Sequence, residues 1–321
     1  MARKKNTKPL ADRAAFLRSI NLVYDAANPE RVAHYQPTAK CVKLIENLAG
    51  LESDRAFFVT APYGSGKSLS ATYLLHLIQN RPEAKPILRS IQKRLRPVGP
   101  EMAKFAERRL RNQKVGGIAI VLEGYQEDIG GSLKQAGLEA LSRVKMGRQA
   151  RAIEKIDASG PNGAVEVLSA ICDKAAKAKK DRVIIVWDEF GRHLERLVAA
   201  GQSAKIGDIQ QIAEYVSRAD AVPVTFSAIM HQGLLTYAGS TSQTGLSAWR
   251  KVEGRFQTIQ YVDDSKEIYL LIGKLLQDAK REVQEPKVGY TPDGGLKQFG
   301  LLNDFTVEEL AALERDVIPL E

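Results

Sequence analysis

The sequence predicts an α/β protein in which helices cover a parallel β-sheet. Short apolar runs with the composition of strands alternate with longer helical patterns along most of the 321-residue chain. Each run is apolar on both faces, as is typical of strands buried in a parallel sheet. A glycine-rich turn, APYGSGKS, joins the first run to the helical pattern that follows it. Turns of this kind place a helix N-terminus where it can bind phosphate.

Five stretches are expected to form the strands. Each is rich in Val, Ile or Phe and is bounded by turn residues, which together favour a short buried strand. These stretches are residues 55–61, 116–124, 182–190, 222–230 and 255–262. Apolar residues recur at helical spacing in the segments between and after them, and these predict helices at residues 67–80, 131–144, 164–180, 206–220 and 264–279.

Composition favours a globular protein without a membrane-spanning segment. No run approaches the roughly 18 apolar residues that a membrane span needs. The basic N-terminus, MARKKNTKPLADR, has no apolar stretch behind it and therefore does not resemble a secretory signal. We expect a cytoplasmic protein with no membrane partner.

The cysteines and histidines argue against two classes of site. Cys41 and Cys172 are far apart, and each lies in an apolar helical pattern. Neither a disulfide framework nor a zinc site is therefore expected. The four histidines have no spacing that suits a metal ion.

Positive charge is concentrated in one segment of a chain whose formal net charge is +9. Residues 81–115 contain eleven Lys and Arg but only three Glu, and breaks at Pro86, Pro97 and Pro100 predict that they form short helices. Such a basic helical insertion attracts nucleic acid, but an ordinary solvated helical surface has the same composition. Both interpretations stay open, because only Phe105 places an aromatic ring among the bases.

The turn APYGSGKS departs at one position from the phosphate-loop pattern G-x-x-x-x-G-K-[ST]. Ala61 replaces the first glycine, at the end of the strand and farthest from the phosphates. Gly64 and Gly66 supply the backbone conformations and the close approach that a phosphate requires. Lys67 would contact the β- and γ-phosphates, and the hydroxyl of Ser68 would bind Mg²⁺. The expected nucleotide-binding residues of this turn are Tyr63, Gly64, Ser65, Gly66, Lys67, Ser68 and Leu69.

A second part of the site is expected at the end of the third strand, in VIIVWDEF. Asp188 would lie at the carboxyl end of the strand beside the loop, where ligand sites form in α/β sheets. It would hold Mg²⁺ through water, and Glu189 would act as the general base for the attacking water. The alternative is that the two acids only cap the following helix.

These residues together resemble the AAA+ ATPases. The stretches APYGSGKS, VIIVWDEF, VPVTFSAIM and GRFQTIQYVDDSKEIYLLI follow the order found in that family, over residues 31–279. The resemblance is to the branch that contains origin-recognition and STAND-type ATPases. DEFGRHLE and MHQG, with the basic block, also look like the large ATPases of bacterial anti-phage defence systems such as BREX. The resemblance implies a P-loop ATPase core at residues 1–264 that uses ATP and Mg²⁺.

The resemblance also implies an adenine pocket. The family contacts adenine ahead of the first strand, where HYQPT lies, so Tyr35, Gln36 and Pro37 are candidates. An ordinary helix start, with Pro37 near its first position, explains the same residues equally well.

Two further roles follow from the resemblance. A polar sensor facing the γ-phosphate is expected at the end of the fourth strand, where the family more often has Asn and this chain offers Ser227, His231 or Gln232. Arg255, with Arg250 as the alternative, corresponds to the arginine that reaches the nucleotide of a neighbouring subunit. That role implies a homo-oligomer or an assembly with related subunits. Arg255 could also be an ordinary surface residue before an edge strand.

Residues 265–321 are expected to form part of a helical lid. They begin with a helix and include the amphipathic stretch FTVEELAALERD. This segment is short for a full lid in the family, so we expect the chain to be a fragment of a longer protein.

Three functions are compatible with the motifs. The first is a Mg²⁺-dependent ATPase module that is coupled to nucleic-acid handling, with anti-phage defence as the expected setting. The second is a STAND-type switch, in which nucleotide binding sets the assembly state and turnover is small. The third is a small-molecule phosphotransferase, which Glu189 and the GRFQTIQ segment disfavour.

Overall fold

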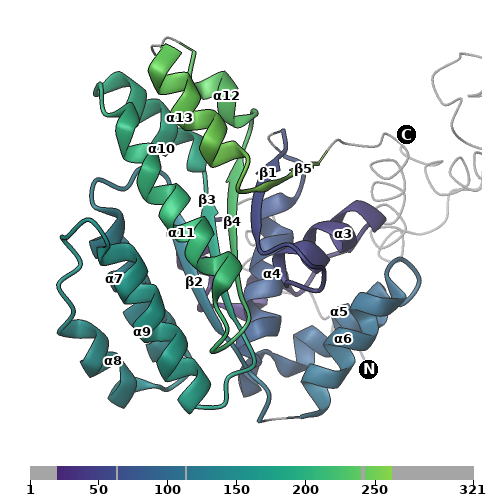
Figure 1. Cartoon of the computed structure of the whole chain (residues 1–321). Coiled ribbons are helices and arrows are strands. Elements are labelled where there is room, and N and C mark those ends of the chain that lie inside the picture. The colour runs from purple at the N-terminus through teal and green to yellow at the C-terminus, as the bar shows by residue number, and fades with distance from the viewer. Residues whose placement is uncertain (1–19, 63, 113, 240–242, 262–321) are drawn as a thin grey trace, which may run out of the picture. The chain divides into compact units, whose positions relative to one another are not determined.

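The computed structural model describes residues 20–62, 64–112, 114–239 and 243–261. Within these residues the strands form one five-stranded sheet in the order β2-β3-β4-β1-β5, and all neighbours are parallel (Figure 1). The strands are β1 Ala56–Thr60, β2 Ile118–Glu123, β3 Val183–Asp188, β4 Val224–Met230 and β5 Gln257–Gln260. The predicted parallel α/β fold is confirmed, although each strand is shorter than its predicted range.

Helices lie on both faces of this sheet (Figure 1). The helices before β2 are α2 Leu22–Asp25, α3 Ala39–Leu48, α4 Lys67–Gln79, α5 Lys85–Leu95 and α6 Pro100–Arg111. Those between β2 and β4 are α7 Ile129–Arg143, α8 Gly147–Glu154, α9 Gly163–Lys177, α10 Phe190–Ala199 and α11 Ile206–Arg218. Between β4 and β5 lie α12 Leu234–Tyr237 and α13 Gln243–Glu253.

Alternating strand residues divide the core into two apolar clusters. In β2, Ile118 and Ile120 join the cluster beneath α7, α9, α10, α11 and α13. Ala119 and Val121 point to the other face and join the cluster beneath α3, α4, α5 and α6. Successive strand side chains point to opposite faces, so a strand that is covered on both sides must be apolar throughout.

The strand order decides which loops meet. Thr60 at the end of β1 pairs with Met230 at the end of β4, and Trp187 near the end of β3 pairs with Ala228. The phosphate-loop turn after β1 and the acids after β3 therefore share the carboxyl edge of the sheet, with β4 between them. We call the opposite side, where the strands begin, the amino edge.

Residues 81–115 form the helices predicted for the basic segment. Helices α5 and α6 pack against each other, and they bury Leu88, Ile91 and Phe105 in the same cluster as α3 and α4. Position 99, which precedes α6, has no room for a side chain, because a Cβ added to Gly99 would lie 2.5 Å from Cγ1 of Val42. The segment is thus part of the folded core on that face of the sheet.

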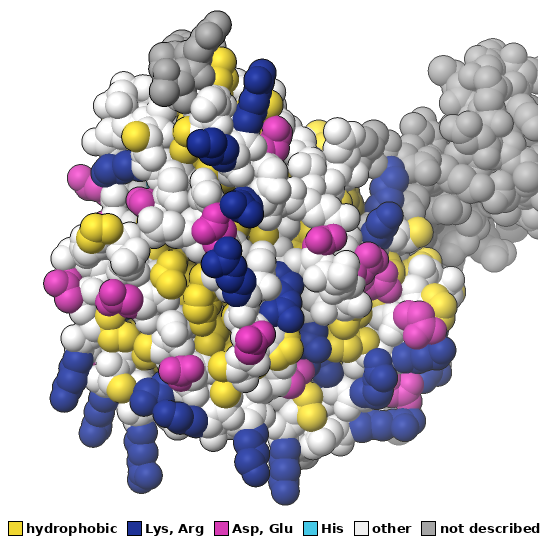
Figure 2. All heavy atoms as spheres, viewed as in Figure 1, with side chains coloured by type: hydrophobic (Ala, Val, Ile, Leu, Met, Phe, Trp, Pro, Cys, Tyr) yellow, Lys and Arg dark blue, Asp and Glu magenta, His cyan; other side chains and the backbone are white. Residues whose placement is uncertain are grey.

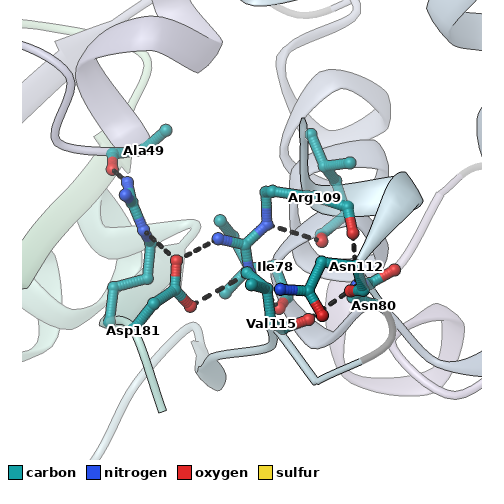
Figure 3. A network of polar contacts seen from close by, with 9 residues as sticks. Ala49, Ile78, Asn80, Arg109, Asn112, Val115 and Asp181 are labelled. Carbon is teal, nitrogen blue, oxygen red and sulfur yellow. Dashed lines mark hydrogen bonds and ion pairs between the residues drawn. The ribbon is translucent and has the colours of Figure 1, made fainter. Parts of the chain in front are cut away.

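Two arginines of the basic segment hold the fold together. The side chain of Arg109 is buried, forms an ion pair with Asp181, and donates hydrogen bonds to the carbonyls of Leu77 at 3.2 Å and Ile78 at 2.7 Å (Figure 3). Arg94 donates to the backbone carbonyls of Tyr35 and Ala33. The sequence led us to expect either a solvated surface or a nucleic-acid contact for this segment. Arg94 and Arg109 have neither role, because their guanidinium groups bind other parts of the same fold.

Within the described ranges, no helix has the length and apolar character needed to cross a bilayer. The chain divides into two compact units after Tyr261, near the predicted boundary at residue 264. The second unit contains the expected lid, which lies outside the described residues.

Candidate functional site

The phosphate-loop turn has the backbone conformation that its glycines predict. Gly64 and Gly66 both have φ of +79°, in the left-handed region that favours glycine. No atom lies within 4 Å of a Cβ built on either residue, so the face of the loop is open. The backbone conformation, rather than lack of space, therefore requires glycine at both positions.

Ala61 fits its position at the strand end. It is buried, has no positive φ, and its N–H donates to the carbonyl of Met230 at 3.0 Å. In the rest of the loop, the Ser65 hydroxyl donates to the carbonyl of Pro62 at 2.9 Å, and Leu69 lies in the first turn of α4. Tyr63 lies outside the described residues.

Lys67 opens α4 and points back across the loop. Its side chain is buried, and its Nζ donates to the carbonyl of Pro62 at 3.0 Å and lies 3.4 Å from Nδ1 of His231. The free N–H groups of the first turn of a helix attract anions, and a lysine ammonium beside them strengthens that attraction. This end of α4 is therefore a cationic site at the carboxyl edge.

Ser68 and Asp188 are in contact at the carboxyl edge of the sheet, although they are 120 residues apart in the chain. The Ser68 hydroxyl donates to Oδ2 of Asp188 at 2.7 Å. Asp188 is buried, and its other oxygen, Oδ1, accepts the N–H of Glu189 at 2.9 Å. Because the hydroxyl acts as the donor, the lone pairs of its oxygen are still available to a cation.

Glu189 is in an uncommon backbone conformation. Its φ is +51°, a value that non-glycine residues adopt rarely and mostly where function or surrounding contacts demand it. Its carboxylate forms an ion pair with Arg192 at 2.8 Å, one turn along α10. Glu189 precedes the first residue of α10, but its side chain makes no N-capping hydrogen bond. The alternative that this residue serves only as a helix cap is therefore not what the structure shows.

The residues expected to act as a polar sensor are separated by the structure. His231 follows β4, and its Nδ1 lies near Lys67 and 3.2 Å from the carbonyl of Ala61. Burial and the nearby Lys67 lower the pKa of His231, which favours the neutral ring. Ser227 lies in the middle of β4, paired with Phe57, and is not brought to the loop. Gln232 is exposed.

The expected adenine-pocket residues form the start of a helix. Thr38 caps α3, and Pro37 precedes that cap. Tyr35 is buried, donates its hydroxyl hydrogen bond to Ser70 at 3.0 Å, and stacks on Tyr73 with ring centroids 5.3 Å apart. Tyr35 thus packs against α4 in the core, whereas Gln36 is half-buried.

Arg255 lies at the amino edge, two residues before β5, while the loop lies at the carboxyl edge of the adjacent strand β1. Its half-exposed guanidinium pairs with Glu214 of α11 at 3.2 Å. Arg250 is exposed in the last turn of α13. This arrangement separates Arg255 from the phosphate-loop turn of its own chain. Arg255 could therefore contact only a nucleotide that is bound to a neighbouring molecule.

One carboxylate of the site was missed by the sequence reasoning. Glu123 ends β2 and pairs in register with Asp188, and Asn21 donates to its Oε1 at 2.7 Å. Burial first, and then the nearby Glu189, raise the pKa of Glu123. Glu123 and Glu189 line a cleft of about 700 Å³, and no described residue of the phosphate-loop turn is among its lining residues. The sequence did offer a signal for Glu123, because it is an acidic residue at the end of a second apolar strand.

No protein-family model matches the chain, and no curated protein matches its sequence. Among the described residues, no group of three or more His, Cys, Asp or Glu side chains is placed to hold a metal ion. The expected Mg²⁺ site does not need such a group, because Mg²⁺ in phosphate sites is bound by one or two protein oxygens, water and the phosphates.

Proposed function

We propose that this protein binds ATP with Mg²⁺ and hydrolyses the γ-phosphate. The hydrogen bond between Ser68 and Asp188 carries the proposal, because it joins the phosphate-loop turn to the acids of a different strand. A turn that bound phosphate without a metal ion would not require a buried carboxylate next to its serine hydroxyl. The open loop face at Gly64 and Gly66 supports the same conclusion, since phosphate oxygens need close approach to backbone N–H groups.

The donor set suits Mg²⁺. In an octahedral shell with ligands at about 2.1 Å, neighbouring ligand oxygens are about 3 Å apart. The oxygens of Ser68 and Asp188 are separated by 2.7 Å, so Ser68 could hold the ion directly, and Asp188 could hold it directly or through a water molecule. The bound ion would stabilise negative charge on the phosphate oxygens. Lys67 would add a positive charge from the opposite side, and His231 would lie next to it.

Glu189 would orient and deprotonate the attacking water. In the structure one of its carboxylate oxygens, Oε2, pairs with Arg192 at 2.8 Å, and this ion pair would orient the carboxylate. The alternative is a nucleotide-gated switch with little turnover. Measured turnover therefore distinguishes a working ATPase from a switch.

We predict that Glu189→Gln lowers the rate of ATP hydrolysis by roughly 10²–10⁴-fold, as loss of a general base does. ATP affinity should change little, because the amide keeps the shape of the side chain. Glu195→Gln is the matched control, since Glu195 is exposed on the same helix. Phosphate release and the binding of a fluorescent ATP analogue give the two readings. Nucleotide binding without turnover in the unaltered protein would favour the switch, and absence of nucleotide binding would contradict both functions.

We further propose that the active form is an assembly in which Arg255 acts on the nucleotide of a neighbour. A mixture tests this directly, because Arg255→Ala retains Glu189 and Glu189→Gln retains Arg255. Each variant alone should be nearly inactive, whereas the mixture should hydrolyse ATP well above the sum of the two. Arg250→Ala mixed with Glu189→Gln is the control, and the same gain there would assign the role to Arg250. A mixture with no gain, from an inactive Arg255→Ala, would contradict action between subunits.

A further inference from the structure

The left-handed residues of the chain point to a second functional surface. Four described residues other than glycine have positive φ: Asn80, Lys145, Lys179 and Glu189. Asn80 has a structural reason, because its side-chain amide donates to the carbonyls of Arg109, Asn112 and Val115 (Figure 3). Glu189 belongs to the candidate active site. The two lysines have neither explanation, since neither side chain has a hydrogen bond or ion pair with a described residue.

Both lysines follow a helix in the same motif. Lys145 follows α7, with hydrogen bonds from Lys145 N–H to Ser142 and from Met146 N–H to Leu141. Lys179 follows α9 with the equivalent pair of bonds, from Lys179 to Ala176 and from Lys180 to Ala175. These are Schellman motifs, whose left-handed position is usually glycine.

The chain itself supplies the comparison. The same pair of hydrogen bonds ends α3 at Gly50 and α10 at Gly201. At Gly201 no atom lies within 4 Å of an added Cβ, so only the backbone conformation favours glycine there. Lys145 and Lys179 occupy that conformation with a side chain, at a cost in stability that glycine would avoid.

The two lysines lie on one strongly charged edge. Helices α7 and α9 pack side by side and both end at the amino edge, opposite the candidate active site. Residues 143–182 contain ten Lys and Arg against five Asp and Glu, and Asp181 among these acids is paired with Arg109. Figure 2 shows Lys and Arg side chains along the lower border of the view, below α8 and α9 of Figure 1. We define the basic edge as Lys114, Lys145, Arg148, Arg151, Lys177 and Lys179, all of them exposed.

We propose that this basic edge binds double-stranded nucleic acid through its phosphate backbone. A row of exposed cations supplies the phosphate contacts of such binding. Single strands are bound with the help of stacking aromatic rings, and the exposed large aromatic residues in the described ranges, Tyr24 and Tyr125, lie outside residues 143–182. Insertion into a membrane surface needs exposed apolar side chains, and those of the described ranges also lie outside this segment. The proposal does not depend on ATP binding.

The test uses Lys145→Gly combined with Lys179→Gly in the full chain. Glycine relieves the left-handed strain, so Tm should rise by about 2 °C, while a labelled 25-base-pair duplex should bind roughly tenfold more weakly at 0.1 M salt. The slope of log affinity against log salt should become shallower by about 2, one for each lost phosphate contact. A stabilised protein that binds less cannot owe the loss to misfolding.

Two variants control for charge and chemistry. Lys43→Ala with Lys251→Ala removes the same charge from exposed positions elsewhere and should leave duplex affinity within about twofold, since distant exposed charges are screened. Lys145→Arg with Lys179→Arg keeps the charge and should keep the affinity. Four results would each overturn the proposal. Two concern duplex affinity: no change in the glycine variant, or an equal loss in the Lys43 and Lys251 variant. The others are an unchanged or lower Tm of the glycine variant, and tighter binding to vesicles of anionic lipid than to duplex.

Discussion

Replacing Lys67 with alanine is expected to abolish ATP binding and turnover. The lysine is the buried cation at the N-terminus of α4, and its removal takes away the charge that would face the β- and γ-phosphates of a bound ATP. Loss of a charge-assisted contact to phosphate in a protected site weakens binding by about 100-fold or more. Titration with a fluorescent ATP analogue, together with phosphate release, measures both effects.

Ala61→Gly is the matched control for that experiment. Ala61 belongs to the same loop but lies at the strand end with an ordinary backbone conformation, so glycine should leave ATP affinity within about twofold. A thermal melt of Lys67→Ala checks that the loop change has not unfolded the protein. A folded Lys67→Ala variant that binds ATP as tightly as the unaltered protein would contradict the proposed phosphate site.

Replacing Arg109 with alanine is expected to destabilise the fold by about 3–5 kcal/mol, the usual result of removing one partner of a buried ion pair. Its guanidinium is 2% exposed and satisfies two helix carbonyls of α4 as well as the carboxylate of Asp181. Without it, both carbonyls lose their charged donor, and the carboxylate of Asp181 keeps only its pair with Arg182. Urea unfolding, with the midpoint and slope fitted together, gives the change in free energy.

Arg108→Ala provides the comparison, because Arg108 precedes Arg109 on α6 but is exposed. Its replacement should change the free energy of unfolding by no more than about 0.5 kcal/mol. Equal effects of the two substitutions would mean that the buried network of Figure 3 does not stabilise the fold. The difference also matters for tests of the proposed nucleic-acid binding, since a variant that lacks Arg109 would combine loss of stability with loss of charge.

Prediction from sequence succeeded where the determinant is local. An apolar run such as VIIVW has to be buried on both faces, which predicts a central parallel strand before any partner is known. The prediction for Gly64 and Gly66 was correct for a similar reason, because a left-handed backbone conformation favours glycine whatever surrounds it. The ends of the strands were placed less well, since pairing with neighbours decides where a strand stops.

Prediction failed where a side chain meets a distant partner. Arg109 has the same local surroundings as Arg108, and helical phase against α4 alone makes one buried and the other exposed. For Tyr35 the sequence left an adenine pocket and an ordinary helix start open, and only the structure shows that its ring packs in the core on Tyr73. The basic edge was missed because Lys145 and Lys179 follow the ends of two helices, α7 and α9, and α8 and α9 separate these two residues in the chain.

The sequence by itself determined the parallel α/β fold, the phosphate-loop turn and an acidic pair at the end of a buried strand. Apolar periodicity and glycine conformation are properties of neighbouring residues, so a single chain displays them. Only the tertiary structure brought Ser68 to Asp188 across β4, buried Arg109 on Asp181, and gathered Lys145 and Lys179 on one edge. These contacts depend on strand order and helix packing, which join residues far apart in the chain and leave no local pattern.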